Sequence, residues 1–327
     1  MTDASSGPLS QTAGEDAVMI RFDRMTRRYG DLTAAHGVSF EVREGEMFGL
    51  IGPDGAGKTT TLRVALGLLA PTEGSVRTCG LDPVAQAGAL SERIGYLSQR
   101  FSLYGDLTVD ENVAFFALIH GVRGWRPRRD ALLDMLRMAP FRARLADRLS
   151  GGMKQKLALA CTLIHTPRLL ILDEPTTGVD PVSRRDFWRI LARLQREGLT
   201  IVLTTPYLDE AERCQRVALM DRGRILTVST PDALRQETAE ALVELIARPR
   251  RQAALWLRAQ AEIADVESFG ERLHVTLRGT AALEAAAAGQ RLASGLVAQG
   301  VTVESVRTVR PTLEDVFISR IRDEVPA

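Results

Sequence analysis

The chain has 327 residues, which is enough for one large domain or two unequal ones. Its 42 Lys plus Arg residues nearly balance its 41 Asp plus Glu residues, which excludes the bulk positive charge that attracts nucleic acid. Three scattered cysteines, Cys79, Cys161 and Cys214, lack the spacing of metal ligands or of a disulfide framework and indicate a reducing compartment. No apolar run reaches the roughly 18–20 residues that a membrane-spanning helix requires.

The N-terminal segment, residues 1–17, is rich in Ser, Thr, Gly and Ala. It lacks the charged start and apolar core of a signal peptide, so we expect it to be a disordered lead-in. Short strands are expected next, at Val18–Phe22 and Val38–Val42.

A glycine-rich loop follows the apolar run Met47–Ile51 and precedes a helical stretch, Thr61–Leu69. A strand, loop and helix of this kind bind phosphate, because glycines let backbone N–H groups close around it and the helix N-terminus adds its positive dipole end. Lys58 is expected to reach the β- and γ-phosphates, and the Thr59 hydroxyl to ligate Mg²⁺. The loop residues expected to hold the nucleotide are Gly52, Pro53, Asp54, Gly55, Ala56, Gly57, Lys58, Thr59 and Thr60.

The middle of the chain reads as mainly helical, with a helix at Asp110–Ile119 followed by a Pro/Arg-rich turn at Arg123–Arg129. Another helix begins at Ser150-Gly151-Gly152, where Ser150 is a natural N-cap and the free N–H groups form an anion site. The apolar positions on one face of this helix are Leu157, Ala160, Cys161 and Ile164.

The run Leu169–Leu172 is too short for a typical helix and predicts a buried parallel strand. Asp173 and Glu174 follow at its carboxyl end, where open α/β sheets bind their ligands. With a phosphate loop in the same chain, Asp173 is expected to hold the Mg²⁺ shell and Glu174 to act as general base on the attacking water.

Together these motifs resemble, in order and spacing, the nucleotide-binding domain of an ABC transporter, continuously from about Val18 to Thr230. The resemblance implies a P-loop NTPase fold of class α/β, with a helical subdomain at about residues 100–160. It implies ATP and Mg²⁺ as cofactors, with two ATP molecules sandwiched between two such domains. In that arrangement Ser150, Gly151 and Gly152 contact the γ-phosphate held by the opposite subunit, and Asp180 communicates across the dimer.

Two further site residues are implied by their place in this order. Tyr29 resembles the aromatic that stacks on adenine, the alternative being a strand-end tyrosine packed on the core. Gln99 resembles the glutamine that senses Mg²⁺ and the attacking water, the alternative being ordinary polar surface. Several apolar side chains after Gln99 are candidates for contact with a membrane partner, with core packing as the alternative. They are Phe101, Leu103, Tyr104, Phe115 and Phe116.

One position departs from the resemblance. After the strand Thr200–Thr205 the family places a histidine that reaches the γ-phosphate, and this chain has Pro206 there. Proline offers neither a side-chain donor nor a backbone N–H. We therefore expect ATP hydrolysis that is slow, or a site degenerate enough to act mainly as a regulatory ATP-binding module in a heterodimer.

The tail, residues 239–327, lies beyond the ATPase core. Strands are expected at Ala241–Ile246, Val266–Phe269, Leu273–Leu277 and Val301–Val309, with helices at Arg251–Ile263 and Ala281–Ala298. This order is βαββαβ, a small α+β domain of ferredoxin-like type.

The last segment, Pro311–Phe317, resembles the ending of ATPase subunits of the ABC-2 or drug-resistance exporter type, a plain amphipathic helix being the alternative. The prediction is a peripheral subunit on the cytoplasmic face of the membrane, forming a homodimer or heterodimer that closes on ATP and powers a separate ABC-2-type permease. Non-transport ABC ATPases are a weaker alternative, because this chain carries neither a second such domain nor a long coiled coil.

Overall fold

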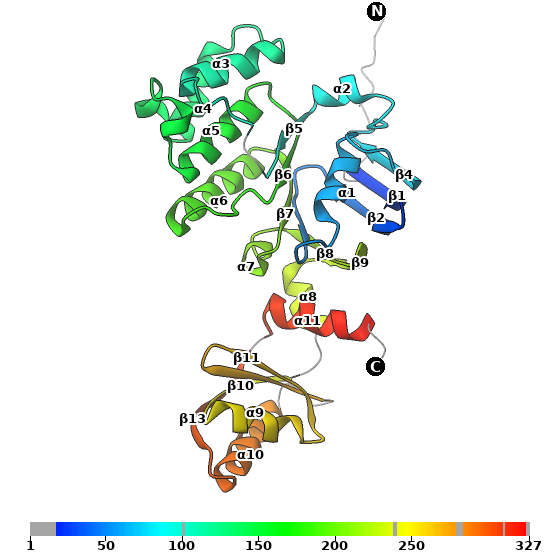
Figure 1. Ribbon diagram of the computed structural model, residues 1–327, viewed down its shortest axis with the longest axis vertical. Helices are drawn as coiled ribbons and strands as arrows, with labels where there is room; N and C mark the ends of the chain where they lie inside the picture. The colour runs from blue at the N-terminus through cyan, green and yellow to red at the C-terminus, as the bar shows by residue number, and fades with distance from the viewer. Residues whose placement is uncertain (1–17, 100–101, 238–240, 279–283, 310, 325–327) are drawn as a thin grey trace, which may run out of the picture. The chain divides into compact units, whose positions relative to one another are not determined.

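The computed structural model describes residues 18–99, 102–237, 241–278, 284–309 and 311–324 (Figure 1). The expected disordered segment 1–17 and the candidate contact residue Phe101 lie outside the described residues. Two compact units are present: the first comprises the described residues up to Tyr207 together with Cys214–Val228, and the second comprises Leu208–Arg213 and the described residues from Ser229 onward. Within the described part of the chain, no helix is both long and apolar enough to cross a membrane.

The first unit is built on a six-stranded sheet with the strand order β5-β6-β7-β3-β8-β9. Its strands are β3 (Met47–Ile51), β5 (Ile94–Leu97), β6 (Leu169–Asp173), β7 (Thr200–Thr205), β8 (Arg216–Asp221) and β9 (Arg224–Ser229). Neighbours from β5 through β8 pair in parallel, and every residue of β3, β6 and β7 is buried. Because parallel strands share one direction, their carboxyl ends meet at one edge of the sheet, and the candidate site lies there.

A second sheet of the first unit contains β1 (Val18–Tyr29), β2 (Leu32–Arg43) and β4 (Glu73–Thr78). The short strands expected at Val18–Phe22 and Val38–Val42 are thus only the apolar parts of two 12-residue strands. The antiparallel ladder continues to the pair Tyr29↔Leu32 through several register shifts. Hydropathy misses this extension because the outer residues are mostly exposed and the pairing uses backbone groups.

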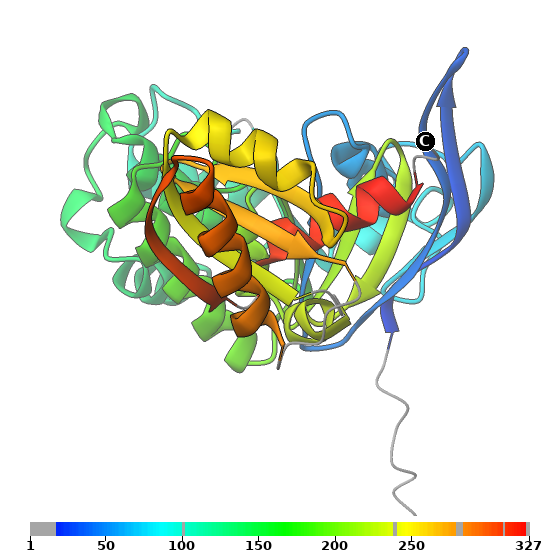
Figure 2. The ribbon, with the colours of Figure 1, turned by 90° about the horizontal axis from the view of Figure 1, so that it is seen from below.

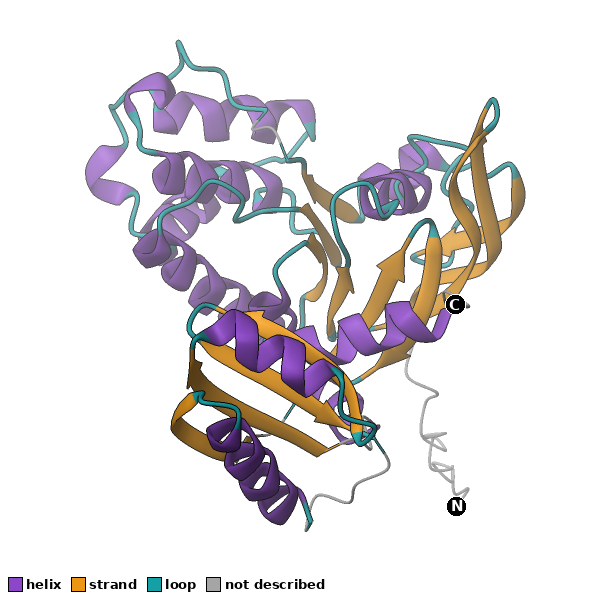
Figure 3. Cartoon of the chain, turned by 60° about the horizontal axis from the view of Figure 1, so that its bottom comes forward, coloured by secondary structure: helices purple, strands orange, loops and turns teal. Residues whose placement is uncertain are grey.

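Helices α3 to α6, which Figure 1 labels, lie together in Figure 3; α3 to α5 fall mostly within the range of about 100–160 expected for a helical subdomain, and α6 lies beyond it. The unit contains α1 (Lys58–Ala65), α2 (Ala87–Ser91), α3 (Val109–Ile119), α4 (Arg126–Met135), α5 (Gly151–Leu163) and α6 (Pro181–Arg196), with 3₁₀ turns at Ala139–Phe141 and Ala146–Arg148. All four apolar positions expected on one face of α5 are buried.

Two expected helix boundaries in this unit are wrong. The helix expected at Thr61–Leu69 ends at Ala65, because Gly67 takes a left-handed φ of 71° and its chain turns against the carbonyl of Pro83. The expected turn Arg123–Arg129 is already helical from Arg126, because a proline is favourable in the first turn of a helix.

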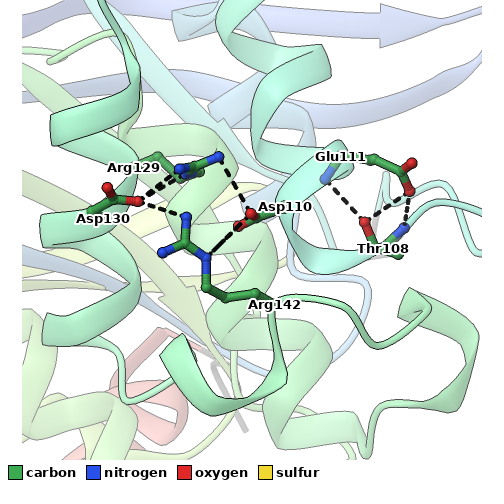
Figure 4. Close-up of polar contacts among 6 residues, drawn as sticks. All are labelled: Thr108, Asp110, Glu111, Arg129, Asp130 and Arg142. Carbon is green, nitrogen blue, oxygen red and sulfur yellow. Dashed lines mark hydrogen bonds and ion pairs between the residues drawn. The ribbon is translucent and has the colours of Figure 1, made fainter.

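Two polar arrangements fix the helical subdomain (Figure 4). Thr108 and Glu111 form a capping box at the start of α3, each side chain accepting a backbone N–H of the other residue. Arg142 then bridges α3 and α4, donating to Asp110 at 3.0 Å and to Asp130 at 2.7 Å. The bridge ties the chain after α4 to both helices.

The second unit carries a four-stranded antiparallel sheet with the order β11-β12-β10-β13. Its elements are α7 (Leu208–Ala211), α8 (Pro231–Glu237), β10 (Ala241–Arg248), α9 (Arg250–Arg258), β11 (Ile263–Phe269), β12 (Arg272–Leu277), α10 (Ala285–Ala298), β13 (Thr302–Val309) and α11 (Leu313–Glu324). Helices α9 and α10 pack on one face of the sheet (Figure 2). The βαββαβ order with β10 and β12 in the centre confirms the ferredoxin-like prediction.

The helix expected at Arg251–Ile263 is too long, since α9 ends at Arg258 and Ile263 begins β11 with its side chain buried in the sheet core. The intervening Ala259, Gln260 and Ala261 are good helix formers, so helix propensity does not indicate the end of α9. The expected start of the next helix at Ala281 lies outside the described residues, and α10 is present from Ala285.

The other face of this sheet holds a charged cluster around Glu244 of β10. Arg307 of β13 donates to Glu244 at 2.8 Å, and the Nε2 atom of His274 of β12 lies 3.5 Å from it. The Nδ1 atom of His274 lies 3.1 Å from Asp315 on α11. Hydrogen bonding to Asp315 and the nearby Glu244 raise the pKa of His274, although partial burial opposes them. Strand β12 and the C-terminal helix are therefore joined by a titratable contact.

Candidate active site

The phosphate loop runs from the end of β3 to the start of α1 and accepts only glycine at two of its positions. A Cβ atom at Gly52 would lie 2.1 Å from the carbonyl oxygen of Met220. Gly57 has a φ of 102°, and a Cβ atom there would lie 2.2 Å from the carbonyl oxygen of Ala34. The glycines thus let the loop pack closely against β8 and β2.

Lys58 is only 3% exposed and donates to the carbonyl oxygens of Gly52 and Pro53 at 2.8 and 2.9 Å. Its ammonium also lies 3.6 Å from the carboxylate of Glu174. A buried cation thus stands at the mouth of the loop and beside a carboxylate, as phosphoryl-transfer chemistry requires.

Asp173, at the end of β6, is 1% exposed and accepts a hydrogen bond of 3.0 Å from Thr59. The side-chain oxygens of these two residues thus lie within hydrogen-bonding distance of each other, and their roles toward Mg²⁺ stay predictions. Oxygen ligands of this kind suit Mg²⁺, which binds one or two protein ligands together with phosphates and water. The residues present therefore fit a magnesium ion held jointly by Thr59, Asp173 and a nucleotide.

Glu174 directly follows and takes a left-handed φ of 47°. Its carboxylate accepts a hydrogen bond of 2.8 Å from the Nε2 atom of Gln99. Gln99 is exposed, yet it reaches the predicted general base, so ordinary polar surface is an incomplete description of it. The structure thus brings Lys58, Thr59, Asp173, Glu174 and Gln99 together at one sheet edge.

Two residues of this group escaped the sequence analysis, Tyr96 of β5 and Thr204 of β7. Burial and the neighbouring negative charge of Asp173 raise the pKa of the Tyr96 hydroxyl, so it stays protonated near neutral pH. Thr204 donates a hydrogen bond of 2.7 Å to Asp173. The available signal was positional, because both are polar residues near the carboxyl ends of buried parallel strands.

Four further predicted residues lie at the starts of α5 and α6: Ser150, Gly151, Gly152 and Asp180. Ser150 caps α5 by accepting from Met153 N–H at 3.4 Å, which confirms its capping role. A Cβ atom at Gly152 would lie 2.4 Å from the side chain of Ser183 on α6. Asp180 caps α6, accepting from Ser183 N–H at 2.9 Å. These contacts stay within the two helices, and the roles of Ser150, Gly151, Gly152 and Asp180 toward a second subunit stay predictions.

Tyr29 lies at the end of β1 and is 42% exposed. The guanidinium of Arg27 lies 4.7 Å from the centre of its ring. The alternative of a tyrosine buried in the core is therefore wrong, and stacking of this ring on adenine stays a prediction.

The two units each match a known family. The ABC transporter family matches residues 35–177, and the C-terminal domain of DrrA1-3-like ATP-binding proteins matches residues 230–321. The daunorubicin resistance ATP-binding protein DrrA3 of Streptomyces coeruleorubidus is 35% identical over 308 residues, covering 93% of this chain and 96% of that protein. The chain belongs to the ATP-binding proteins of ABC transporters.

Other ABC proteins match a smaller share of the chain. The probable multidrug ABC transporter ATP-binding protein YbhF of Escherichia coli is 42% identical over 231 residues, which are 70% of this chain and 39% of that protein. The chain thus spans less than half the length of this relative. A solved ATP-binding subunit of an ABC transporter superposes with a TM-score of 0.62 at 28% identity, covering 67% of this chain and 92% of that one.

Pro206 directly follows the last residue of β7. The register of the parallel pair β3 and β7 places Thr205 opposite Ile51, the residue before the phosphate loop. Position 206 therefore follows the strand at the same edge as Gly52. Because proline has neither a side-chain donor nor a backbone N–H, position 206 can donate no hydrogen bond toward that edge.

Proposed function

We propose that this chain is the ATP-hydrolysing subunit of an ABC-2-type exporter, in which closure of two ATP-binding domains moves a separate membrane permease. The observation that carries the proposal is the convergence of Lys58, Thr59, Asp173, Glu174 and Gln99 at one sheet edge. The near full-length match to a daunorubicin resistance protein supports drug export as the transport process.

Each side chain has a chemical role in this proposal. The phosphate loop binds the ATP phosphates through backbone N–H groups, and Lys58 balances the charge of the β- and γ-phosphates. Thr59 and Asp173 would hold Mg²⁺, which neutralises charge on the phosphates when bound. Glu174, oriented by Gln99, accepts the proton of the attacking water.

The two separate groups of site residues support a dimeric arrangement. Ser150, Gly151 and Gly152 present the free N–H groups at the start of α5, which suit the γ-phosphate of ATP held by a second subunit. Asp180 caps the neighbouring helix and would lie at the same subunit boundary. Tyr29, exposed at the end of β1, would stack on adenine. The second subunit is another copy or a related chain.

A half-exposed aromatic group supplies a docking surface for the permease. Tyr104 contacts Phe115, and Phe115 contacts Phe116, with ring centres 4.5 and 5.7 Å apart. Phe116 also lines a groove of about 260 Å³, together with Leu68, Tyr96 and His120. This group is neither buried core nor plain polar surface, so it suits a helix of a membrane partner on the cytoplasmic face of the membrane.

Pro206 supports a second candidate function. Without a donor at this position the transition state is less stabilised, and ATP turnover is expected to be about 10²–10³-fold slower. The chain would then hydrolyse ATP slowly, or hold it as a regulatory ligand beside a partner that keeps the histidine.

The test is ATP binding and steady-state hydrolysis by the purified chain and by two variants. Glu174→Gln should bind ATP with near-native affinity and hydrolyse it about 10²–10⁴-fold more slowly, because it lacks the base. Lys58→Ala should weaken ATP binding itself. A native chain that binds ATP but hydrolyses none, alone or with a histidine-bearing partner, favours the regulatory module. A chain that binds no ATP contradicts both candidates.

A further inference from the structure

Thr204 makes two directed hydrogen bonds at the centre of the candidate active site. It is the last but one residue of β7 and is fully buried. Its hydroxyl lies 2.7 Å from Oδ1 of Asp173 and 3.0 Å from the backbone N of Glu174. A backbone N–H can only donate, so the hydroxyl accepts from Glu174 and gives its own proton to Asp173.

The same residue also holds the backbone of Glu174 through its main chain. The Glu174 N–H lies 3.2 Å from the carbonyl oxygen of Thr204 in addition to the hydroxyl. Glu174 has a left-handed φ of 47°, which a residue with a side chain adopts at a cost of about 1–3 kcal/mol. The two oxygen atoms of Thr204 that accept this N–H hold the backbone of Glu174 in place.

The parallel register explains why Thr204 reaches both carboxylate residues. Asp173 is paired with Thr204 where β6 and β7 run side by side. The side chain of Thr204 therefore lies next to Asp173, which ends β6, and next to the backbone N of Glu174. Any residue without a hydroxyl at this position would leave the Asp173 carboxylate without this donor.

We propose that Thr204 is a positioning residue for the magnesium-ligating carboxylate and the general base. Its hydroxyl orients Asp173 toward Mg²⁺ and holds Glu174 at the angle from which it reaches the attacking water. This inference rests on the proposed ATPase function. Hydrogen-bond partners of metal-ligating side chains typically change metal affinity or activity by about 10–100-fold when they are removed.

The neighbouring Thr205 gives a matched control. It is equally buried, belongs to the same strand, and accepts a hydrogen bond from Tyr207 N–H at 3.0 Å. Replacing either threonine by valine removes one buried hydroxyl of β7 at almost constant volume. Only the substitution at Thr204 should change the magnesium-dependent step.

The experiment compares the native chain with Thr204→Val, Thr204→Ser and Thr205→Val. The dissociation constant of a fluorescent non-hydrolysable ATP analogue is measured with Mg²⁺ and with EDTA, and ATP turnover is measured as a function of Mg²⁺ concentration. Thr204→Val should turn over ATP about 10–100-fold more slowly than the native chain. It should also reduce by about 10-fold the gain in analogue affinity that Mg²⁺ gives, while the dissociation constant in EDTA stays unchanged. Thr204→Ser should restore both quantities.

Equal effects of Thr204→Val and Thr205→Val, or a serine variant no better than the valine one, would overturn the assignment. If Thr204→Val does not fold, as judged by thermal unfolding, Thr204→Ala takes its place and is held to the same comparison with Thr204→Ser. Failure of the proposed function has a different signature. In that case the native chain itself shows no Mg²⁺-dependent nucleotide binding, and Asp173→Asn changes nothing.

Discussion

Replacing Pro206 by histidine should accelerate ATP hydrolysis. The residue before it pairs with Ile51, so position 206 follows β7 at the edge where Gly52 opens the phosphate loop. A histidine there can offer a ring N–H toward the γ-phosphate, which the native proline cannot.

The expected size of the effect follows from the loss of a single donor. One transition-state hydrogen bond of this kind is worth about 10²–10³ in turnover, or roughly 2.7–4 kcal/mol. Since nearby groups have not adapted to the new ring, we expect the lower end, about 10²-fold. Binding of ATP should change little, because the donor acts on charge that develops in the transition state.

The assay is steady-state ATP turnover by the native chain, Pro206→His and Pro206→Ala. The alanine variant removes the rigid ring and restores the backbone N–H without adding a side-chain donor, so it isolates the imidazole. The reasoning is refuted if Pro206→Ala accelerates turnover as much as Pro206→His. A native chain that already turns over at about 10 s⁻¹, the median for enzymes, also refutes it.

Two further predictions concern the loop and the second unit. Gly52→Ala should abolish ATP binding, measured with a fluorescent analogue, because the added methyl would lie 2.1 Å from the Met220 carbonyl oxygen. Gly88→Ala in α2, where no atom lies within 4 Å of the new Cβ, should leave binding intact and stabilise the helix by about 0.5–1 kcal/mol. His274 has a raised pKa in the folded chain, so its contribution to stability is complete below its unfolded value of about 6.5 and is lost as the pH rises through the raised value. The melting temperature of the native chain should therefore exceed that of His274→Gln at about pH 6 and approach it at about pH 9, and a pH-independent difference would contradict this.

The core of the candidate site could be predicted from the sequence because its chemistry depends on local patterns. The phosphate loop requires glycines at fixed positions, and Asp173 and Glu174 stand at the end of a short apolar run. Parallel strands then bring these segments to one edge without further information. The ferredoxin-like order was equally predictable, since its strands alternate on a half-buried sheet.

Thr204 and Tyr96 could not be assigned from sequence because their roles depend on neighbouring strands. Which threonine of the pair Thr204-Thr205 faces Asp173 is decided by the register of β6 and β7. A shift of one residue would exchange the two side chains. The long ladder between β1 and β2 was missed for a related reason, because backbone pairing leaves no hydropathy pattern at exposed positions.

Lys58 contacts both the phosphate loop and the predicted general base, Glu174. An ammonium has three protons to donate, and here two lie against the loop carbonyls of Gly52 and Pro53 while the group also faces Glu174 at 3.6 Å. A phosphate that approaches Lys58 competes with Glu174 for the same positive charge. In the proposed function, a nucleotide in the loop would weaken the attraction of Lys58 for Glu174, the carboxylate proposed to accept a proton from water. Nucleotide binding and the release of Glu174 from Lys58 would then be coupled through this one ammonium group.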